Sequence, residues 1–146
     1  MKTRTLILVF IIMAVLFFTG SCATGKKAVT VPIEPLLVTW VNQDYNKSGK
    51  GYPKIIFRPD GTWATFGHTD ITEGLEGPFT IIDSWIDSDG SKYYKIDAFL
   101  PSYGGTRHIL CRLNETDTII EMIWSNAEYP TEIEHEHPRY LILYRQ

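Results

Sequence analysis

The stretch "PKIIFRPDGTWATFGH", residues 53–68, carries the strongest fold signal in the sequence. At its centre stands the pair Asp60-Gly61, which tolerates the positive φ angles of a tight hairpin turn. An alternating run that ends at Phe57 precedes the pair, and a second β-prone run from Trp63 to Phe66 follows it. The stretch therefore predicts a β-hairpin.

The same rhythm of short β-prone runs and turn signals continues to the C-terminus. Asp89-Gly90 and the segment "NETD", residues 114–117, stand between further pairs of such runs. Consecutive hairpins pair neighbouring strands, so the expected topology is an antiparallel meander. The eight expected strands are Leu36–Val41, the two arms of the hairpin in 53–68, Phe79–Ile86, Tyr93–Leu100, Arg107–Leu113, Thr118–Trp124 and Tyr140–Arg145.

The side-chain pattern indicates that these strands close into a barrel. Successive side chains of a strand point to opposite faces, and in two of the expected strands one face is wholly apolar. Eight such strands lose their exposed edges by closing on themselves. We therefore expect an all-β, eight-stranded, up-and-down antiparallel barrel over residues 36–146. The apolar faces hold Ile109, Cys111 and Leu113 in one strand and Ile120, Met122 and Trp124 in the next.

The N-terminus has the pattern of a secretory signal peptide. Lys2 and Arg4 precede an unbroken apolar run of 13 residues, Leu6–Phe18, and small residues follow it. A 13-residue helix is ~20 Å long at ~1.5 Å per residue, which is short of the ~30 Å hydrocarbon core of a bilayer. The pattern therefore predicts a signal peptide over residues 1–21.

The residues Gly20, Ser21 and Cys22 resemble the lipobox of bacterial lipoproteins. This resemblance implies that Cys22 becomes the first residue after cleavage and carries fatty acyl chains such as palmitate. It places the protein in the bacterial cell envelope, anchored at the outer membrane or facing the periplasm. The alternative is an ordinary secretory cleavage. Residues 22–35 are small, basic and proline-punctuated, and we expect the lipidated cysteine and a flexible tether there.

The net charge of the chain limits the kinds of partner that we expect. The chain has 14 basic and 17 acidic residues, and removal of Lys2 and Arg4 leaves 12 basic residues and a net charge of -5. Nucleic-acid sites need clustered Lys and Arg to neutralise phosphates, so we expect no nucleic-acid partner. The same balance argues against electrostatic attachment to a membrane, which leaves the lipid on Cys22 as the expected membrane contact.

Two segments of the expected barrel carry a resemblance to a known family. "LLVTWVN", residues 36–42, places a tryptophan on the first strand, and "FRPDGTW", residues 57–63, follows on the second hairpin. Together with the meander they look like the lipocalin-like domains of the calycin superfamily, many of which occur on bacterial lipoproteins. The resemblance implies a small hydrophobic ligand in the barrel.

The aromatic residues offer candidate contacts for such a ligand. Phe57, Trp63, Trp85 and Trp124 are the candidates for stacking against it at the barrel mouth. The alternative is that these side chains fill the core, which consumes most inward aromatic residues in a barrel of this size.

Motifs for catalysis or metal binding are weak. The sequence has no Gly-x-Ser-x-Gly elbow, phosphate-binding glycine loop or Cys-x-x-Cys pair, so we expect no enzyme, catalytic residue or cofactor. His135 and His137 supply half of a zinc site, which His68 or His108 would have to complete. Their alternative is an exposed polar loop ending at Pro138, and we predict no metal.

Two functions remain open from the sequence. The first is a lipid-anchored envelope protein whose barrel binds a small hydrophobic ligand. The second is an anchored interaction or structural protein whose barrel is filled and whose loops, especially 126–138 and 101–106, contact an envelope protein. The free volume inside the barrel separates them, since ligand pockets measure ~300 Å³ or more.

Overall fold

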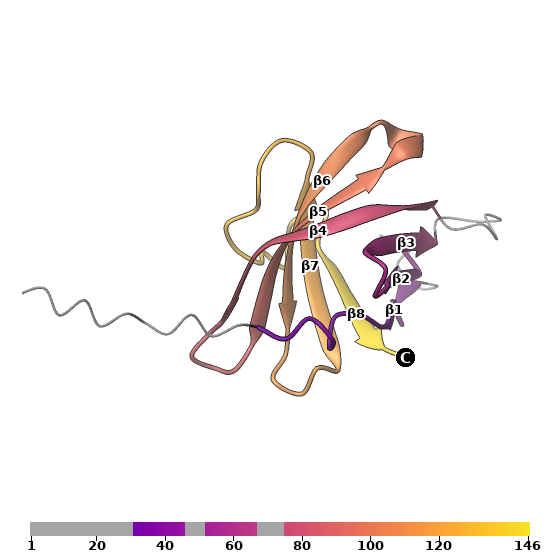
Figure 1. Cartoon of the computed structure of the whole chain (residues 1–146). Helices are drawn as coiled ribbons and strands as arrows, with labels where there is room; N and C mark the ends of the chain where they lie inside the picture. The colour runs from indigo at the N-terminus through magenta and orange to yellow at the C-terminus, as the bar shows by residue number, and fades with distance from the viewer. Residues whose placement is uncertain (1–30, 46–51, 67–74) are drawn as a thin grey trace, which may run out of the picture.

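The computed structural model of the protein describes residues 31–45, 52–66 and 75–146, and their strands form a closed barrel (Figure 1). Each strand pairs antiparallel with its neighbour in the sequence, and β1 also pairs with β8, which closes the ring. The prediction of an all-β barrel of eight antiparallel strands in up-and-down order is thereby confirmed. The strands are β1 (Thr39–Val41), β2 (Lys54–Phe57), β3 (Thr62–Phe66), β4 (Leu75–Ile86), β5 (Lys92–Leu100), β6 (Gly105–Leu113), β7 (Ile119–Ser125) and β8 (Leu141–Arg145), with a 3-10 helix η1 (Pro101–Tyr103) between β5 and β6.

The hairpin in residues 53–68 forms as its sequence predicts. Gly61 has a φ of 80° in the turn between β2 and β3, and its N–H donates to the carbonyl of Arg58 at 3.1 Å. The Asp60 carboxylate accepts hydrogen bonds from the backbone N–H of Thr62 at 2.9 Å and from its hydroxyl at 2.6 Å. These bonds hold the pKa of Asp60 below its ordinary value. The turn is therefore fixed by local chemistry.

β4 is longer than expected and contains a β-bulge. The register with β5 shifts between Ile81 and Asp83, which leaves Ile82 without a partner and 53% exposed. One extra residue reverses which side chains point inward. Phe79 is therefore inside the barrel before the bulge, whereas Trp85 is on the outer face after it, opposite Tyr93. The sequence alone gave no sign of this switch.

Aromatic and aliphatic side chains pack the barrel interior. Phe57 lies between Trp63 and Phe79, with ring centroids 6.2 Å and 5.2 Å away. Cys111 is fully buried, and burial raises the pKa of its thiol. The expected inward faces of β6 and β7 are found: Ile109, Cys111, Leu113, Ile120 and Met122 are all buried, and Trp124 packs against them.

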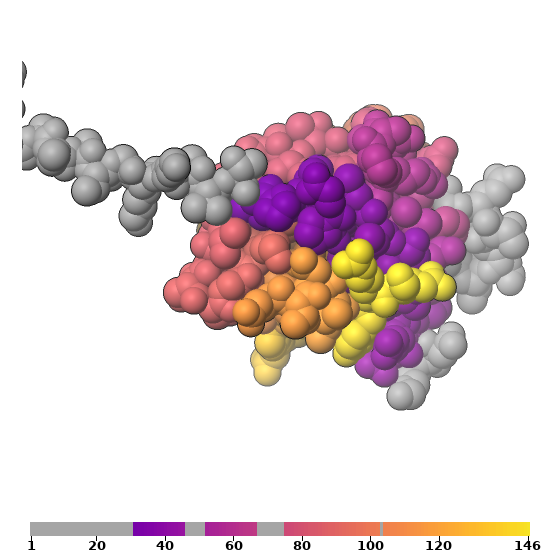
Figure 2. All heavy atoms as spheres, turned by 60° about the horizontal axis from the view of Figure 1, so that its bottom comes forward, coloured from indigo at the N-terminus to yellow at the C-terminus, as the bar shows by residue number. Residues whose placement is uncertain are grey.

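The segment before β1 closes the end of the barrel that carries the β2–β3, β4–β5 and β6–β7 turns. Val31 and Leu36 belong to the core, and the Tyr94 hydroxyl donates to the carbonyl of Pro32 at 2.7 Å. Figure 2 shows this indigo segment lying against the coral β4–β5 turn, the orange β6–β7 turn and the yellow C-terminal strand. Residues 31–35 therefore pack onto the barrel, although we expected them in the tether.

The remainder of the expected leader and tether, including Cys22, lies outside the described residues. None of the helices in the described ranges is long and apolar enough to cross a membrane.

Candidate functional site

The interior of the barrel is the first place to look for a site. Phe57 and Trp63, two of the expected ligand contacts, are each 1% exposed and pack against each other. The Trp63 indole N–H on β3 donates past β4 to the carbonyl of Phe99 on β5 at 3.2 Å. Both side chains therefore act as core residues in this structure.

Trp124, a third expected contact, lies near the end of β7 and next to the side chain of Arg107. The Arg107 guanidinium lies 5.8 Å from the ring of Tyr52 and 6.0 Å from that of Trp124, and it donates to the Tyr52 hydroxyl. The pocket between these side chains measures about 10 Å³, which is no more than one water molecule requires. Its walls are Tyr52, Ile55, Trp63, Arg107, Ile109, Met122 and Trp124.

Trp85, the fourth expected contact, does not join the other three. Its ring stacks on Tyr93 with centroids 5.0 Å apart and planes 5° from parallel, and the Lys95 ammonium lies 5.8 Å from the ring centroid. These residues are on the outer face of β4 and β5. The bulge at Ile82 is the physical reason, because it shifts the alternation of β4 by one residue and so turns the Trp85 side chain to the outer face.

A second site lies outside the barrel, under the connection between β7 and β8. We call this connection, residues 126–140, the strap; it forms the long arch at the upper left of Figure 1. Leu110 and Ile123 pair across β6 and β7 on the outer face, yet they are only 1% and 2% exposed. A small buried layer therefore exists on the outer side of the sheet.

The first end of the strap is tied to the barrel through a carboxylate on β5. The Tyr129 hydroxyl donates to Oδ1 of Asp97, and Nδ1 of His108 lies 2.7 Å from the same oxygen. The rings of Tyr129 and His108 are 4.7 Å apart. Burial, and then the hydrogen bond to Asp97, raise the pKa of Tyr129. The tyrosine therefore stays a neutral donor at physiological pH.

The second end of the strap is tied in the same way through a carboxylate on β7. Glu121 is 8% exposed, and its Oε1 accepts the Tyr140 hydroxyl at 2.7 Å and lies 2.9 Å from Nε2 of His135. Its other oxygen accepts Nε–H of Arg112 at 2.7 Å. Burial and the bond to Glu121 raise the pKa of Tyr140. Both ends of the strap thus use one arrangement: a carboxylate on a strand, a basic side chain on β6 and a tyrosine from the strap.

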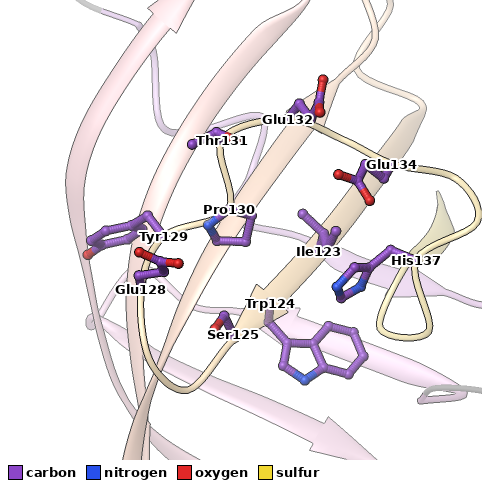
Figure 3. A pocket seen from close by; sticks show the side chains of 10 residues that line it. All are labelled: Ile123, Trp124, Ser125, Glu128, Tyr129, Pro130, Thr131, Glu132, Glu134 and His137. Atoms are coloured by element: carbon purple, nitrogen blue, oxygen red, sulfur yellow. The ribbon is translucent and has the colours of Figure 1, made fainter.

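A pocket of about 260 Å³, the strap pocket, lies between the strap and β7. In Figure 3, Glu128 and Tyr129 are on one side of it, Glu134 and His137 are on the other, and Ile123 and Pro130 lie between them. The pocket is acidic and partly apolar. Its walls are Ile123, Trp124, Ser125, Glu128, Tyr129, Pro130, Thr131, Glu132, Glu134 and His137.

The two strap histidines have different partners. His135 contacts Glu121, whereas Nδ1 of His137 accepts the backbone N–H of Arg139 at 3.1 Å. Across the described ranges, no group of three or more His, Cys, Asp or Glu side chains is arranged to hold a metal ion. His68 lies outside those ranges.

Sequence reasoning did not find the strap pocket as a site. It singled out 126–138 only as a loop for partner contact and the run "TEIEHEHP", residues 131–138, only as a possible half zinc site. The length and acidity of this segment were the available signal. Its attachment points, Asp97 and Glu121, lie on other strands and show no local pattern.

Comparison of the chain with protein-family models, with curated protein sequences and with solved structures finds no match in any of the three. Fold and site together define an eight-stranded up-and-down β-barrel with a packed interior in its described part and a pocket on its outer side. The closed antiparallel barrel is consistent with a lipocalin-like fold.

Proposed function

We propose that the protein is a lipid-anchored, lipocalin-like protein of the bacterial cell envelope that contacts a protein partner through its strap. One contrast in volume carries this proposal. The pocket beside Trp63 and Trp124 inside the barrel holds about 10 Å³, whereas the strap pocket holds about 260 Å³. Ligand pockets usually measure ~300 Å³ or more. The small volume beside Trp63 and Trp124 favours partner contact over storage of a hydrophobic molecule.

The anchor in this proposal is the lipid on Cys22. The segment between Cys22 and the first core residue, Val31, is short. Fully extended at ~3.3–3.6 Å per residue, it would span roughly 30 Å. The barrel would therefore stay close to the membrane surface, and the end that the segment before β1 closes would face the tether. Because the strap connects strands at the opposite end of the barrel, it would be presented to partners in the envelope.

Site-specific cross-linking tests the proposed contact. A photoreactive benzoylphenylalanine would replace Thr131 in the strap or, as control, Thr116 in the β6–β7 turn at the opposite end. Irradiation of intact cells should give a discrete adduct from position 131 and none from position 116. Adducts from both positions, or from neither, would contradict strap-mediated contact.

Binding of a small hydrophobic ligand, the other function considered from the sequence, can be tested on the same protein. The Cys22→Ala protein would be titrated with 1-N-phenylnaphthylamine, a dye that becomes fluorescent in apolar cavities. We expect no saturable signal, because the pocket of about 10 Å³ beside Trp63 and Trp124 is too small for a ring system. Saturation at one dye per protein would favour the ligand-binding function instead.

A further inference from the structure

We propose that the strap pocket receives a lysine or arginine side chain of the protein partner. This inference rests on the proposed function and specifies the chemistry of the contact. Its starting point is the pocket itself, a concave space of about 260 Å³ on the outer side of β7. Three properties of the pocket, namely its charge, its apolar walls and its fixed shape, point to this occupant.

The lining of the pocket carries negative charge. Glu128, Glu132 and Glu134 line it, and none of its ten lining residues is a lysine or arginine, although the strap itself contains Arg139. Three carboxylates elsewhere in the described ranges do have lysine or arginine partners, in the pairs Arg58–Glu76, Lys92–Asp117 and Arg112–Glu121. Within those ranges none of the three pocket glutamates forms an ion pair. A concave surface with one sign of charge attracts the opposite sign.

The uncharged walls match the rest of a lysine or arginine side chain. Ile123 is 2% exposed and lies at the base, and Pro130 and Tyr129 add further apolar surface. Lysine and arginine bury an apolar stem while their charged head stays at a polar rim. In Figure 3, Glu128 and Glu134 face the space from opposite sides, where they would meet such a head group.

The pocket is fixed before a partner arrives. Tyr129 ties the strap to Asp97 at one end, and Tyr140 ties it to Glu121 at the other. Binding to an ordered surface avoids part of the entropy cost of ordering a loop. The carboxylates are therefore held around the space rather than spread over a free chain.

A peptide titration tests the charge requirement. The ¹⁵N-labelled Cys22→Ala protein would be titrated with the blocked peptide acetyl-Gly-Arg-Gly-Arg-Gly-amide. The control peptide carries citrulline, which has the shape of arginine without its charge. We expect saturable shifts at the amides of residues 128–137 with the arginine peptide, and at least tenfold weaker binding with citrulline. Equal binding of both peptides, or shifts confined to other strands, would overturn the inference.

Isosteric variants test the named carboxylates. The double variant Glu128→Gln with Glu134→Gln should weaken arginine-peptide binding about tenfold. The control, Glu115→Gln in the β6–β7 turn, should leave it unchanged. Unaltered binding by a double variant whose amide spectrum stays folded would overturn the inference. Equal affinity for spermidine, a cation without a peptide backbone, would overturn a protein side chain as the occupant.

The outcomes also separate this inference from the proposed function. Cross-links from position 131 without a preference for arginine would remove the cationic occupant and keep the partner contact. Arginine-specific binding in the pocket without cross-links in cells would keep the pocket chemistry and remove the proposed contact.

Discussion

Gly61 tests the fold at the scale of one residue. An added Cβ would meet nothing within 4 Å, but the φ of 80° is unfavourable for an L-residue by ~1–2 kcal/mol. Gly61→Ala should therefore lower the free energy of unfolding by about that amount, as read from the urea midpoint. Gly105→Ala is the matched control, because its Cβ also has open space and its φ lies outside the left-handed region. Equal losses in both variants would contradict this assignment of strain.

Gly77 is required for a different reason, which is close approach of two backbones. A Cβ at this position would lie 2.0 Å from the carbonyl oxygen of Phe99, the same oxygen that accepts the Trp63 indole N–H. Overpacking of a core typically costs ~1–3 kcal/mol, and a backbone atom cannot swing aside. Gly77→Ala should therefore lower the melting temperature clearly and change tryptophan fluorescence. A melting curve that matches that of Gly105→Ala would show that β4 and β5 can separate here without loss.

Single residues differ in how far the sequence reveals their roles. Asp60-Gly61 and the inward position of Cys111 depend on local chemistry and alternation, and the structure confirms both. Trp85 depends on a bulge three residues earlier, which alternation cannot report. Gly77 gave no signal at all, because its requirement comes from a strand that lies next to it only after folding.

At the scale of one element, the strap should loosen when a terminal attachment is cut. Tyr140→Phe removes a hydrogen bond to the buried carboxylate of Glu121, and an underbonded buried polar group costs ~1–3 kcal/mol. The substitution should raise the rate of amide hydrogen exchange more in residues 126–140 than in β5 and β6. Tyr144→Phe on neighbouring β8 is the control, since no hydrogen bond of its hydroxyl occurs within the described ranges. Unchanged exchange in the strap would mean that its apolar contacts alone hold it.

Elements with local hairpins were predictable, whereas the strap's position was not. Six of the expected runs coincide with β1, β4, β5, β6, β7 and β8 within a few residues at their ends, and the remaining two arms with β2 and β3. The strap lacks a period, so its sequence predicts only a loop. Its position depends on Asp97 and Glu121, which lie in distant parts of the chain, and long-range contacts of this kind leave no local pattern.

At the scale of the whole molecule, the anchor on Cys22 is the central prediction. Cells fed an alkyne fatty acid should label the wild-type protein and spare Cys22→Ala, because that thiol is the expected site of acylation. Fractionation should then find the variant detached from the membrane, since acyl chains contribute ~0.8 kcal/mol per buried methylene. Cys111→Ala is the control and should label normally, as Cys111 is fully buried. Equal labelling of wild type and Cys22→Ala would contradict lipidation at this residue.

The barrel closes through its shortest strand pairing, that of β1 with β8. β1 has three residues and meets β8 in two register pairs, Trp40 with Arg145 and Val41 with Tyr144, whereas β5 and β6 run together over nine. Local opening begins where few contacts hold a fold. β1 is also the strand nearest the proposed anchor, so a mechanical pull from the membrane would load this pairing first. β1 and β8 would separate there first, while β4 to β7 and the strap stayed folded.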